Sequence, residues 1–473
     1  MWGMSMFQTR CWATAAAVVS IGWPGVSAAA TLNVPGDFAT IQACINAAIS
    51  GVDECVVGPG TYSETINFLG KAIILRSSGG ADVTTIDATG IGGSVVTCAS
   101  GEGQDTILDS FTITGGTGTA DPYGFKYGGG MFNDHSSPTV TNCAFSGNSA
   151  RAGGGGMYNN YNSSPTVSNC TFSGNTARYF GGGIYNLCSS PTVSNCTFGG
   201  NTVTNGSGGG MYNYNFSNPT VTSCTFRGNT AYYGGGMYNR GNSSPTVTNC
   251  TFSGNTAYYG GGMYNRENSS PAVSGCTFSE NTATADGGGM YNYGSSPTVS
   301  NSILWNDTLD EMVNSNGSTA ATRFSNVQGG LPVGAVDGGG NVDLDPVFVR
   351  PPDPGPDGTW DGVDDDYGDL RLQAGSQCID AGDPGFVAQP AETDLEGHAR
   401  VLCGRVDMGA YEFGIGDYDC DQTVKLNDFA VWSSCMTGPH SGPYEVGCEG
   451  FDFDGDGDVD LLDFGGFQRI VGS

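Results

Sequence analysis

The centre of the chain repeats itself with a period of about 26 residues. Each unit reads approximately Pro-Thr-Val-x-Asn-Cys-Thr-Phe-Ser-Gly-Asn-Thr-Ala and then Gly-Gly-Gly-Met-Tyr-Asn. A period in the twenties with several short β-favouring runs per unit is typical of a solenoid, in which each turn stacks on the next. The units open at Pro138, Pro165, Pro191, Pro219, Pro245, Pro271 and Pro297.

Three short β-favouring runs can be placed in each unit. In the first unit they are Thr139-Val140, Cys143–Phe145 and Met157–Asn159. If Val140, Cys143 and Phe145 all face one interior, the odd step from Val140 to Cys143 requires a bend between them. The bend position holds residues that tolerate the left-handed conformation, chiefly Asn. The sequence therefore predicts an all-β fold, a parallel β-helix with three strands per turn. The bend residues are Asn142, Asn169, Asn195, Ser223, Asn249, Gly275 and Asn301.

The repeated Cys, Phe and Met positions predict columns of identical side chains that fill a narrow core. Metal binding, redox chemistry and disulfides between adjacent turns are the alternatives for the cysteines. The repeated Asn after Ser-Gly predicts ladders of hydrogen-bonded amides. These asparagines are Asn148, Asn175, Asn201, Asn229, Asn255 and Asn281.

The composition excludes several classes of protein. The net charge is −30, which disfavours nucleic acid or an anionic membrane as a partner. The glycines, 79 of 473 residues, are clustered and do not recur at every third position, which excludes collagen. Beyond the N-terminal 30 residues, no apolar run is long enough to span a bilayer, so no membrane span is expected in the rest of the chain.

The N-terminus predicts export. Residues 1–30 have a positive charge at Arg10, an apolar core and small residues near Ala28, as a signal peptide does. A short membrane anchor is the alternative. A secreted, extracellular or cell-surface location follows from the signal.

Residues 31–127 predict the N-terminal cap and the first turns of the coil. We expect Asp37 to cap a short helix that carries Ile41, Cys44, Ile45 and Ile49 on one face. Such a helix would close the open end of the coil and protect its edge hydrogen bonds. Cys44 and Cys55 are close enough in sequence to join this cap to the first strand.

These features resemble the right-handed parallel β-helix of the pectin-lyase-like superfamily. Over residues 128–306 the Phe-x-x-Asn and Gly-Gly-Met/Ile-Tyr elements, such as Phe172–Asn175 with Gly182–Tyr185, also resemble the repeats of polymorphic outer-membrane proteins, which are surface adhesins. The stretch from Ile41-Gln42 to Tyr62-Ser63-Glu64 is similar to the opening of pectinesterase-type β-helices.

The repeats offer little for catalysis. Lyases of the superfamily use acidic calcium ligands with an Arg or Lys base, and its hydrolases use two or three Asp. Residues 128–306 hold only four acids, Asp134, Glu267, Glu280 and Asp286. His135 follows Asp134, but neighbours along a strand are expected to point apart. We therefore predict no catalytic residue.

A binding surface is better supported by the sequence. One column after Tyr-Asn holds Tyr214, Arg240 and Arg266, and a second region holds pairs of tyrosines. Stacked aromatic rings with Arg suit sugar rings or a protein partner. The alternative is a solvated, β-favouring turn surface. The predicted ligand-binding residues are Tyr214, Tyr232, Tyr233, Arg240, Tyr258, Tyr259 and Arg266.

The composition changes near residue 307, where acidic residues and prolines become frequent. Segments of residues 307–413, among them Ile379–Asp383 and Val406–Phe413, resemble the choice-of-anchor domain that closes many secreted bacterial β-helix proteins. The resemblance implies a final cap and retention at a surface. Cys378 and Cys403 are a plausible disulfide within it.

Residues 414–473 carry two calcium-loop patterns. A calcium loop supplies oxygens from positions 1, 3, 5 and 12 and the carbonyl of position 7, with a sharp turn at position 6. Gly457 supplies that turn in the second loop, but Gln422 takes its place in the first. An acidic solubilising tail is the alternative. The predicted Ca²⁺ ligands are Asp417, Asp419, Asp421, Thr423 and Asp428, and Asp452, Asp454, Asp456, Asp458 and Asp463.

Asp at position 12 and the aromatic residue after it, as in Asp463-Phe464, resemble dockerin loops. The resemblance implies a small α-helical, EF-hand-like domain that docks onto a cohesin-like protein. The two loops lie further apart than in compact dockerins, which puts recognition of that partner in doubt.

Together these features predict a secreted or cell-surface β-helix that is not catalytic and that binds a polysaccharide or surface glycan, or acts in adhesion. Two alternatives stay open. One is a polysaccharide lyase or glycoside hydrolase, and the other is a rigid structural spacer.

Overall fold

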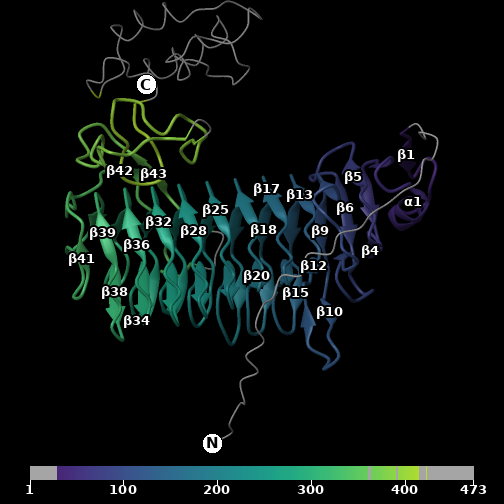
Figure 1. Cartoon of the computed structure of the whole chain (residues 1–473), viewed down its shortest axis with the longest axis horizontal. Coiled ribbons are helices and arrows are strands. Elements are labelled where there is room, and N and C mark those ends of the chain that lie inside the picture. Colours follow the sequence, from purple (N-terminus) through teal and green to yellow (C-terminus); the bar gives the residue numbers. More distant parts are fainter. Residues whose placement is uncertain (1–28, 361–363, 390–391, 415–421, 423–473) are drawn as a thin grey trace, which may run out of the picture.

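The computed structural model describes residues 29–360, 364–389, 392–414 and 422. The chain coils into a long parallel β-helix, with one short helix at its N-terminal end and an irregular segment alongside its C-terminal third (Figure 1). Three sheets, A, B and C, form its sides, and their strands pair in parallel from turn to turn. The expected small α-helical domain lies outside the described residues.

Sheet A contains the strands that begin each repeat. Its strands, in order along the coil, are β1 (Thr31–Val34), β2 (Glu54–Val57), β5 (Ile74–Ser77), β8 (Ile107–Asp109), β13 (Thr139–Thr141), β17 (Thr166–Ser168), β21 (Thr192–Ser194), β25 (Thr220–Thr222), β28 (Thr246–Thr248), β32 (Ala272–Ser274), β36 (Thr298–Ser300), β39 (Ala321–Arg323) and β41 (Val336–Asp337).

Sheet B follows sheet A across a one-residue bend. Its strands are β3 (Gly60–Tyr62), β6 (Thr84–Asp87), β9 (Thr112–Thr114), β14 (Ala144–Ser146), β18 (Thr171–Ser173), β22 (Thr197–Gly199), β26 (Thr225–Arg227), β29 (Thr251–Ser253), β33 (Thr277–Ser279), β37 (Ile303–Trp305) and β40 (Asn326–Val327).

Sheet C follows the glycine runs. Its strands are β4 (Ile66–Asn67), β7 (Val96–Cys98), β12 (Met131–Asp134), β16 (Met157–Asn160), β20 (Ile184–Leu187), β24 (Met211–Tyr214), β27 (Met237–Arg240), β31 (Met263–Arg266), β35 (Met290–Tyr293) and β38 (Met312–Ser315).

Shorter strands complete the turns. Parallel pairs between sheets B and C are formed by β15 (Ser149–Ala150), β19 (Thr176–Ala177) and β23 (Thr202–Val203), and by β30 (Thr256–Tyr259) and β34 (Thr282–Asp286). Two antiparallel pairs are β10 (Thr119–Ala120) with β11 (Lys126–Tyr127), and β42 (Phe348–Arg350) with β43 (Asp369–Leu372).

The core is built from the predicted columns. Strand pairing is in register, so Phe226 lies over Phe252 and Val221 over Val247. Neighbouring rings of the Phe column stack with centroids 4.5–5.0 Å apart and are fully buried. The six repeat cysteines, from Cys143 to Cys276, are buried free thiols. Core packing is therefore the role that the structure gives them, and the adjacent-turn disulfides do not form.

The bend between sheets A and B has the predicted conformation. Asn142, Asn169 and Asn195 have φ values of 52–53°, and the other four bend residues, Ser223, Asn249, Gly275 and Asn301, have φ values of 50–59°. One residue in the left-handed region lets Val140 and Cys143 both point inward despite their odd spacing.

Two amide ladders run along the coil. In the predicted ladder, the Asn229 side-chain NH₂ donates to Asn255 Oδ1 and to the Phe198 carbonyl, both at 2.9 Å. A second ladder runs inside sheet C, where Asn213 donates to Asn239 at 2.8 Å. These asparagines are buried, so the ladders satisfy polar groups that would otherwise destabilise the interior.

The N-terminal end is closed by α1 (Ile41–Ala47), the only α-helix among the described residues. Its N-cap is Thr40 and not Asp37, because Thr40 Oγ1 accepts the Ala43 N–H while Asp37 accepts from Asn33. Ile41, Cys44 and Ile45 are buried, and the expected fourth core residue, Ile49, is exposed. The Cys44–Cys55 disulfide is confirmed.

The segment of residues 344–413, here called the flanking segment, packs against the side of the coil (Figure 1). Trp360 fills the space beside Gly254, where a Cβ atom would lie 2.5 Å from the indole. The Ala410 N–H donates to Thr277 Oγ1 and the Gly409 N–H to the Asn301 carbonyl. The segment therefore covers the outer side of sheet B and the bend.

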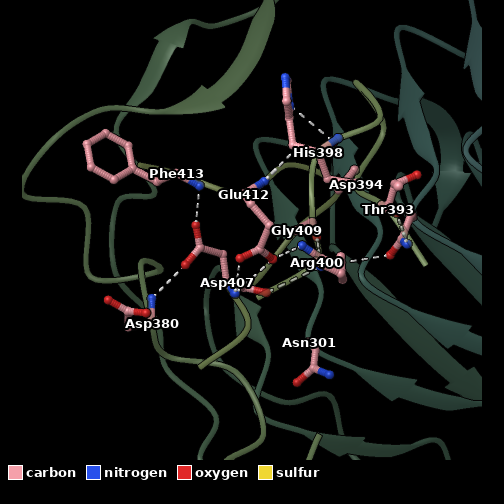
Figure 2. A network of polar contacts seen from close by, with 12 residues as sticks. Asn301, Asp380, Thr393, Asp394, His398, Arg400, Asp407, Gly409, Glu412 and Phe413 are labelled. Carbon is pink, nitrogen blue, oxygen red and sulfur yellow. Dashed lines mark hydrogen bonds and ion pairs between the residues drawn. The ribbon is translucent and has the colours of Figure 1, made fainter. Parts of the chain in front are cut away.

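A buried charge network holds this contact (Figure 2). Arg400 is 1% exposed, pairs with Glu412 and donates to Asn249 Oδ1 at 3.1 Å. Asp407 accepts the N–H groups of Asp380 and Phe413. The network explains why one bend residue is glycine, since a Cβ atom on Gly275 would lie 2.7 Å from the Arg400 guanidinium.

One expected disulfide of this segment is wrong. Cys378 is a buried free thiol, whose amide and side chain contact Ser376 and Asn326. Cys403 is disulfide-bonded, but not to Cys378. Sequence proximity within one segment did not bring these two thiols together, because Cys378 turns into the small core around Ile303 and Met408.

Candidate functional site

The outer side of sheet C carries a continuous aromatic surface, here called the aromatic face. In each Met-Tyr-Asn strand, alternation turns Met and Asn inward and Tyr outward. The preceding glycines let neighbouring turns approach closely, since a Cβ atom on Gly236 would lie 2.6 Å from the Gly262 carbonyl oxygen. The outward tyrosines form one packed cluster of Tyr158, Tyr185, Tyr212, Tyr238, Tyr264 and Tyr291.

Two tyrosine pairs stand over this buried column. Tyr232 and Tyr258 stack with centroids 4.8 Å apart and are 47% and 40% exposed. Each meets its sequence neighbour edge to face, Tyr232 with Tyr233 at 4.6 Å and Tyr258 with Tyr259 at 4.8 Å. Tyr233 in turn packs on Tyr238, with centroids 6.1 Å apart. The exposed rings of Tyr232 and Tyr258 are therefore supported by the partly buried rings of Tyr233 and Tyr259.

The ends of the strands add charge to the same face. Arg240 Nε lies 2.9 Å from Glu267 Oε2, and Arg266 Nε lies 3.4 Å from Glu267 Oε1. Arg240 also lies over the ring of Tyr214 and Arg266 over the ring of Tyr293, at 5.7 and 5.5 Å. Burial alone would lower the pKa of Arg240, but the hydrogen bond to Glu267 and the charge interactions with Tyr212, Tyr238 and Glu267 together raise it.

The structure brings all seven residues of the predicted binding surface to this one face. Tyr214, Arg240 and Arg266 are the last residues of β24, β27 and β31, so they lie in successive turns. Tyr233 and Tyr259 bridge successive turns before the glycine runs, with Tyr232 and Tyr258 beside them. Whether the face binds a ligand stays a prediction.

Sequence reasoning missed two parts of the site. The buried column that supports the rings, such as Tyr212 and Tyr238, was readable from the alternation in Met-Tyr-Asn, which places Tyr outside the coil. Glu267 as the partner of two arginines was not readable, since it depends on the left-handed turn at Glu267 itself, where φ is 58°.

Among the acids of the repeats, Glu267 lies on this face, where it pairs with Arg240 and Arg266. Asp134 and His135 do contact each other, with Oδ1 and Nδ1 3.0 Å apart, so the expectation that they point apart is wrong. The reason is the φ of 51° at His135, which ends the strand alternation. Burial raises the pKa of Glu280 and of Asp286. Among the described residues, no group of three or more His, Cys, Asp or Glu is arranged to hold a metal ion.

The predicted Ca²⁺ ligands, from Asp417 to Asp463, lie outside the described residues. One residue of the first loop is described. Gln422, at the position of the sharp turn, has a φ of 63°, and its side-chain oxygen accepts the Gly375 N–H at 3.1 Å. Over the described part of the chain, no helix has the length and apolar character that crossing a membrane requires.

Comparisons with solved structures return proteins of similar architecture. A pectate lyase, Pel9A, aligns with 14% identity and a TM-score of 0.47, covering 82% of this chain and 97% of the lyase. A pectin methylesterase from carrot aligns with 12% identity and a TM-score of 0.35, covering 63% of this chain and 89% of the esterase. These values are too low to carry an activity to this chain.

No curated protein matches the sequence. The family model described as "Right handed beta helix region" matches residues 61–224 and 192–328. The two matches overlap and together span more than half of the 473 residues. The right-handed coil that this family model describes agrees with the resemblance drawn from the repeats, and the chain belongs to the right-handed β-helix family.

Proposed function

We propose that the protein binds a polysaccharide or surface glycan on its aromatic face and that it is not an enzyme. The observation that carries the proposal is the exposed stack of Tyr232 on Tyr258, on the face whose strands end in the Arg240–Glu267–Arg266 group. A sugar ring presents C–H groups that pack on an aromatic face and hydroxyls that reach polar groups at its rim. Sites of this kind combine aromatic walls with a few placed polar side chains.

The electrostatics of the face support a largely neutral ligand. Burial raises the pKa of Tyr238 to about 12, so its hydroxyl stays protonated at neutral pH. Glu267 lies between two arginines and offsets part of their charge. The ring stack runs along the coil, since Tyr232 and Tyr258 belong to successive turns. A linear chain of sugars that lies parallel to the axis would meet successive rings.

The test is a retention and turnover screen of the whole chain on plant, algal and bacterial polysaccharides. We expect retention without new reducing ends or unsaturated products. The double variant Tyr232→Ala and Tyr258→Ala should lose at least about tenfold in affinity, because stacked rings at the centre of a site dominate binding. Tyr123→Ala removes an exposed ring elsewhere and is the matched control. Product formation, or equal binding by the double variant, would contradict the proposal.

We also propose that the chain is exported and that residues 414–473 form a calcium-binding, dockerin-like attachment to a cohesin-like protein. The left-handed φ of Gln422 supports the first loop, because position 6 of a calcium loop needs such a turn. The spacing of Asp452, Asp454, Asp456 and Asp463 supports the second.

Calcium titration tests this second proposal. We expect two calcium ions per chain, and we expect Asp456→Ala to remove one of them. Because an ion that binds only the folded state stabilises it, chelation should raise hydrogen exchange in residues 415–473 and leave the coil unchanged. Unchanged exchange after chelation would contradict the calcium proposal, and loss of the whole fold would show that calcium also holds the coil.

A further inference from the structure

Sheet C ends one strand before sheet B and two strands before sheet A. Sheets A and B continue beyond β38 with β39, β41 and β40, but in the described part of the chain β38 has a single strand neighbour, β35. In a regular turn, residues 280–297 separate sheet B from sheet A and include a sheet C strand. After β40, only residues 328–335 connect sheet B to sheet A. This connection is too short to form another sheet C strand and the turns on either side of it.

The outer edge of β38 is therefore unpaired. In a parallel sheet, the N–H and C=O of one residue face the same neighbour, and the next residue faces the opposite one. Met290 N–H donates to the Glu311 carbonyl, so Glu311, Val313 and Ser315 face β35. Met312 and Asn314 face away, and no backbone hydrogen bond joins either of them to the described chain that follows.

The sheet C ladder is also left open at this edge. Asn292 donates to Asn314 Oδ1 at 3.0 Å, as each earlier asparagine donates to the next. The NH₂ of Asn314 is buried and has no acceptor among the described residues. A buried donor without a partner carries a free-energy penalty that an added acceptor would remove.

A hollow of about 640 Å³ lies along this edge. Asp286 and Asp310 line it together with Asp307 and Glu311, which are only 8% and 6% exposed. Asp307 Oδ2 and Glu311 Oε2 have no hydrogen-bond partner. Among the described residues that line the hollow, none is basic and none is aromatic. It is therefore unlike the aromatic face, and a cation that entered it would take the place of the protons that burial favours on Asp307 and Glu311.

Both buried acids depart from the repeat at this turn alone. Asp307 occupies the position of the ladder asparagine. Its Oδ1 accepts a hydrogen bond from the Asn281 NH₂, just as Asn281 Oδ1 accepts one from the Asn255 NH₂. Glu311 precedes Met312 at the position where Gly289 precedes Met290 one turn earlier, so a carboxylic acid replaces the glycine of the repeat. The last turn thus exchanges an amide and a glycine for two carboxyl groups beside the open edge.

We propose that this edge accepts an extended segment of another protein, which adds to β38 as a parallel eleventh strand of sheet C. The partner segment carries an apolar residue opposite Met312, an Asn or similar acceptor opposite Asn314, and a Lys or Arg opposite the acids. Strand addition of this kind takes its affinity from backbone hydrogen bonds and its specificity from side-chain positions. The opposite end of a second copy does not fit, because α1 covers its first strands.

The experiment uses the full chain and a capped peptide, acetyl-Gly-Lys-Met-Tyr-Asn-Gly-amide, which repeats the strand pattern with Lys beside Met. We expect saturable 1:1 binding by calorimetry, weakened at least about tenfold when Glu replaces Lys or when the Tyr and C-terminal Gly amides, which would donate to the Met312 and Asn314 carbonyls, are N-methylated. Asn314→Ala and the pair Asp307→Asn with Glu311→Gln should weaken it similarly. Asp337→Asn, an exposed acid on sheet A, is the control and should bind as the unchanged protein does.

Three results would overturn the proposal. They are the absence of saturable binding, binding that ignores the Lys-to-Glu exchange or the Asn314→Ala change, and self-association of the full chain that Asn314→Ala abolishes. Thermal melting of each variant separates lost binding from lost folding. Tyr232→Ala with Tyr258→Ala should leave peptide binding unchanged, so this result is independent of the glycan proposal.

Discussion

The repeated coil and the flanking segment are stabilised in opposite ways. The coil is held by columns of identical side chains, such as the Phe stack and the Asn ladders, in which each turn repeats the contacts of the last. The flanking segment is held by a few contacts made once, centred on Arg400 and Glu412. A change in the coil is therefore shared between neighbouring turns, whereas a change in the network removes the contact altogether.

The largest expected effect is the loss of Arg400. Arg400→Met leaves Glu412 buried without its partner, and removing one member of a buried pair costs about 3–5 kcal/mol. Hydrogen exchange should rise across residues 344–413 while the coil stays protected. Arg371→Met, which removes an exposed pair with Asp369, should cost less than about 1 kcal/mol. Equal losses of stability in Arg400→Met and Arg371→Met would show that the buried Arg400–Glu412 pair is not what holds the flanking segment to the coil.

The second prediction concerns pH at the end of the coil. Burial raises the pKa of Asp307 to about 7 and, with the nearby Asp307, that of Glu311 to about 11. A raised pKa means that the folded state favours the protonated form, so its stabilisation is complete below the ordinary carboxyl pKa of about 4. That stabilisation should be lost as pH rises through about 7 at Asp307.

The amide variant sharpens this prediction. Asp307→Asn restores the ladder rung and cannot ionise, so the loss of stability between about pH 4 and 7 should shrink. Each unit of raised pKa corresponds to about 1.4 kcal/mol. Denaturant unfolding at pH 4.5 and pH 7.5 measures the difference. A variant with the same pH dependence as the unchanged protein would show that Asp307 is not the titrating group.

A smaller effect is expected in the middle of the coil. Asn229→Ala leaves the buried backbone N–H of Asn201 without an acceptor, which costs about 1–3 kcal/mol, while the Asn201 NH₂ keeps its bond to the Phe172 carbonyl. Raised exchange should be confined to the turns that contain Asn201, Asn229 and Asn255. Raised hydrogen exchange along the whole coil would instead show that the turns unfold together.

The coil was predictable because its signal recurs. Seven units fix the strand positions, the inward columns and the left-handed bend, and the structure agrees at Val140, Asn142 and Phe145. The expected helix cap and the orientation of His135 were wrong, since each depends on one local backbone conformation that Asp37 or His135 does not reveal.

The flanking segment was much less predictable. Its central contact joins Arg400 to Asn249, which are 151 residues apart, and nothing in its sequence repeats. The only local trace is Gly275, a glycine in a column of asparagines, which the structure explains by the guanidinium beside it. At the aromatic face the sequence indicated the exposed rings but not the pairing of Glu267 with two arginines, because that pairing depends on the left-handed turn at Glu267.

Hydroxyl-radical footprinting of the glycan complex tests the central claim most directly. It reports the accessibility of individual tyrosines, and Tyr123, at 87% exposed, is an internal reference. With the polysaccharide that the screen retains, we predict that oxidation of Tyr232 and Tyr258 falls severalfold while that of Tyr123 is unchanged. Protection of the flanking segment instead, with both rings of the stack still oxidised, would contradict the aromatic face as the binding surface.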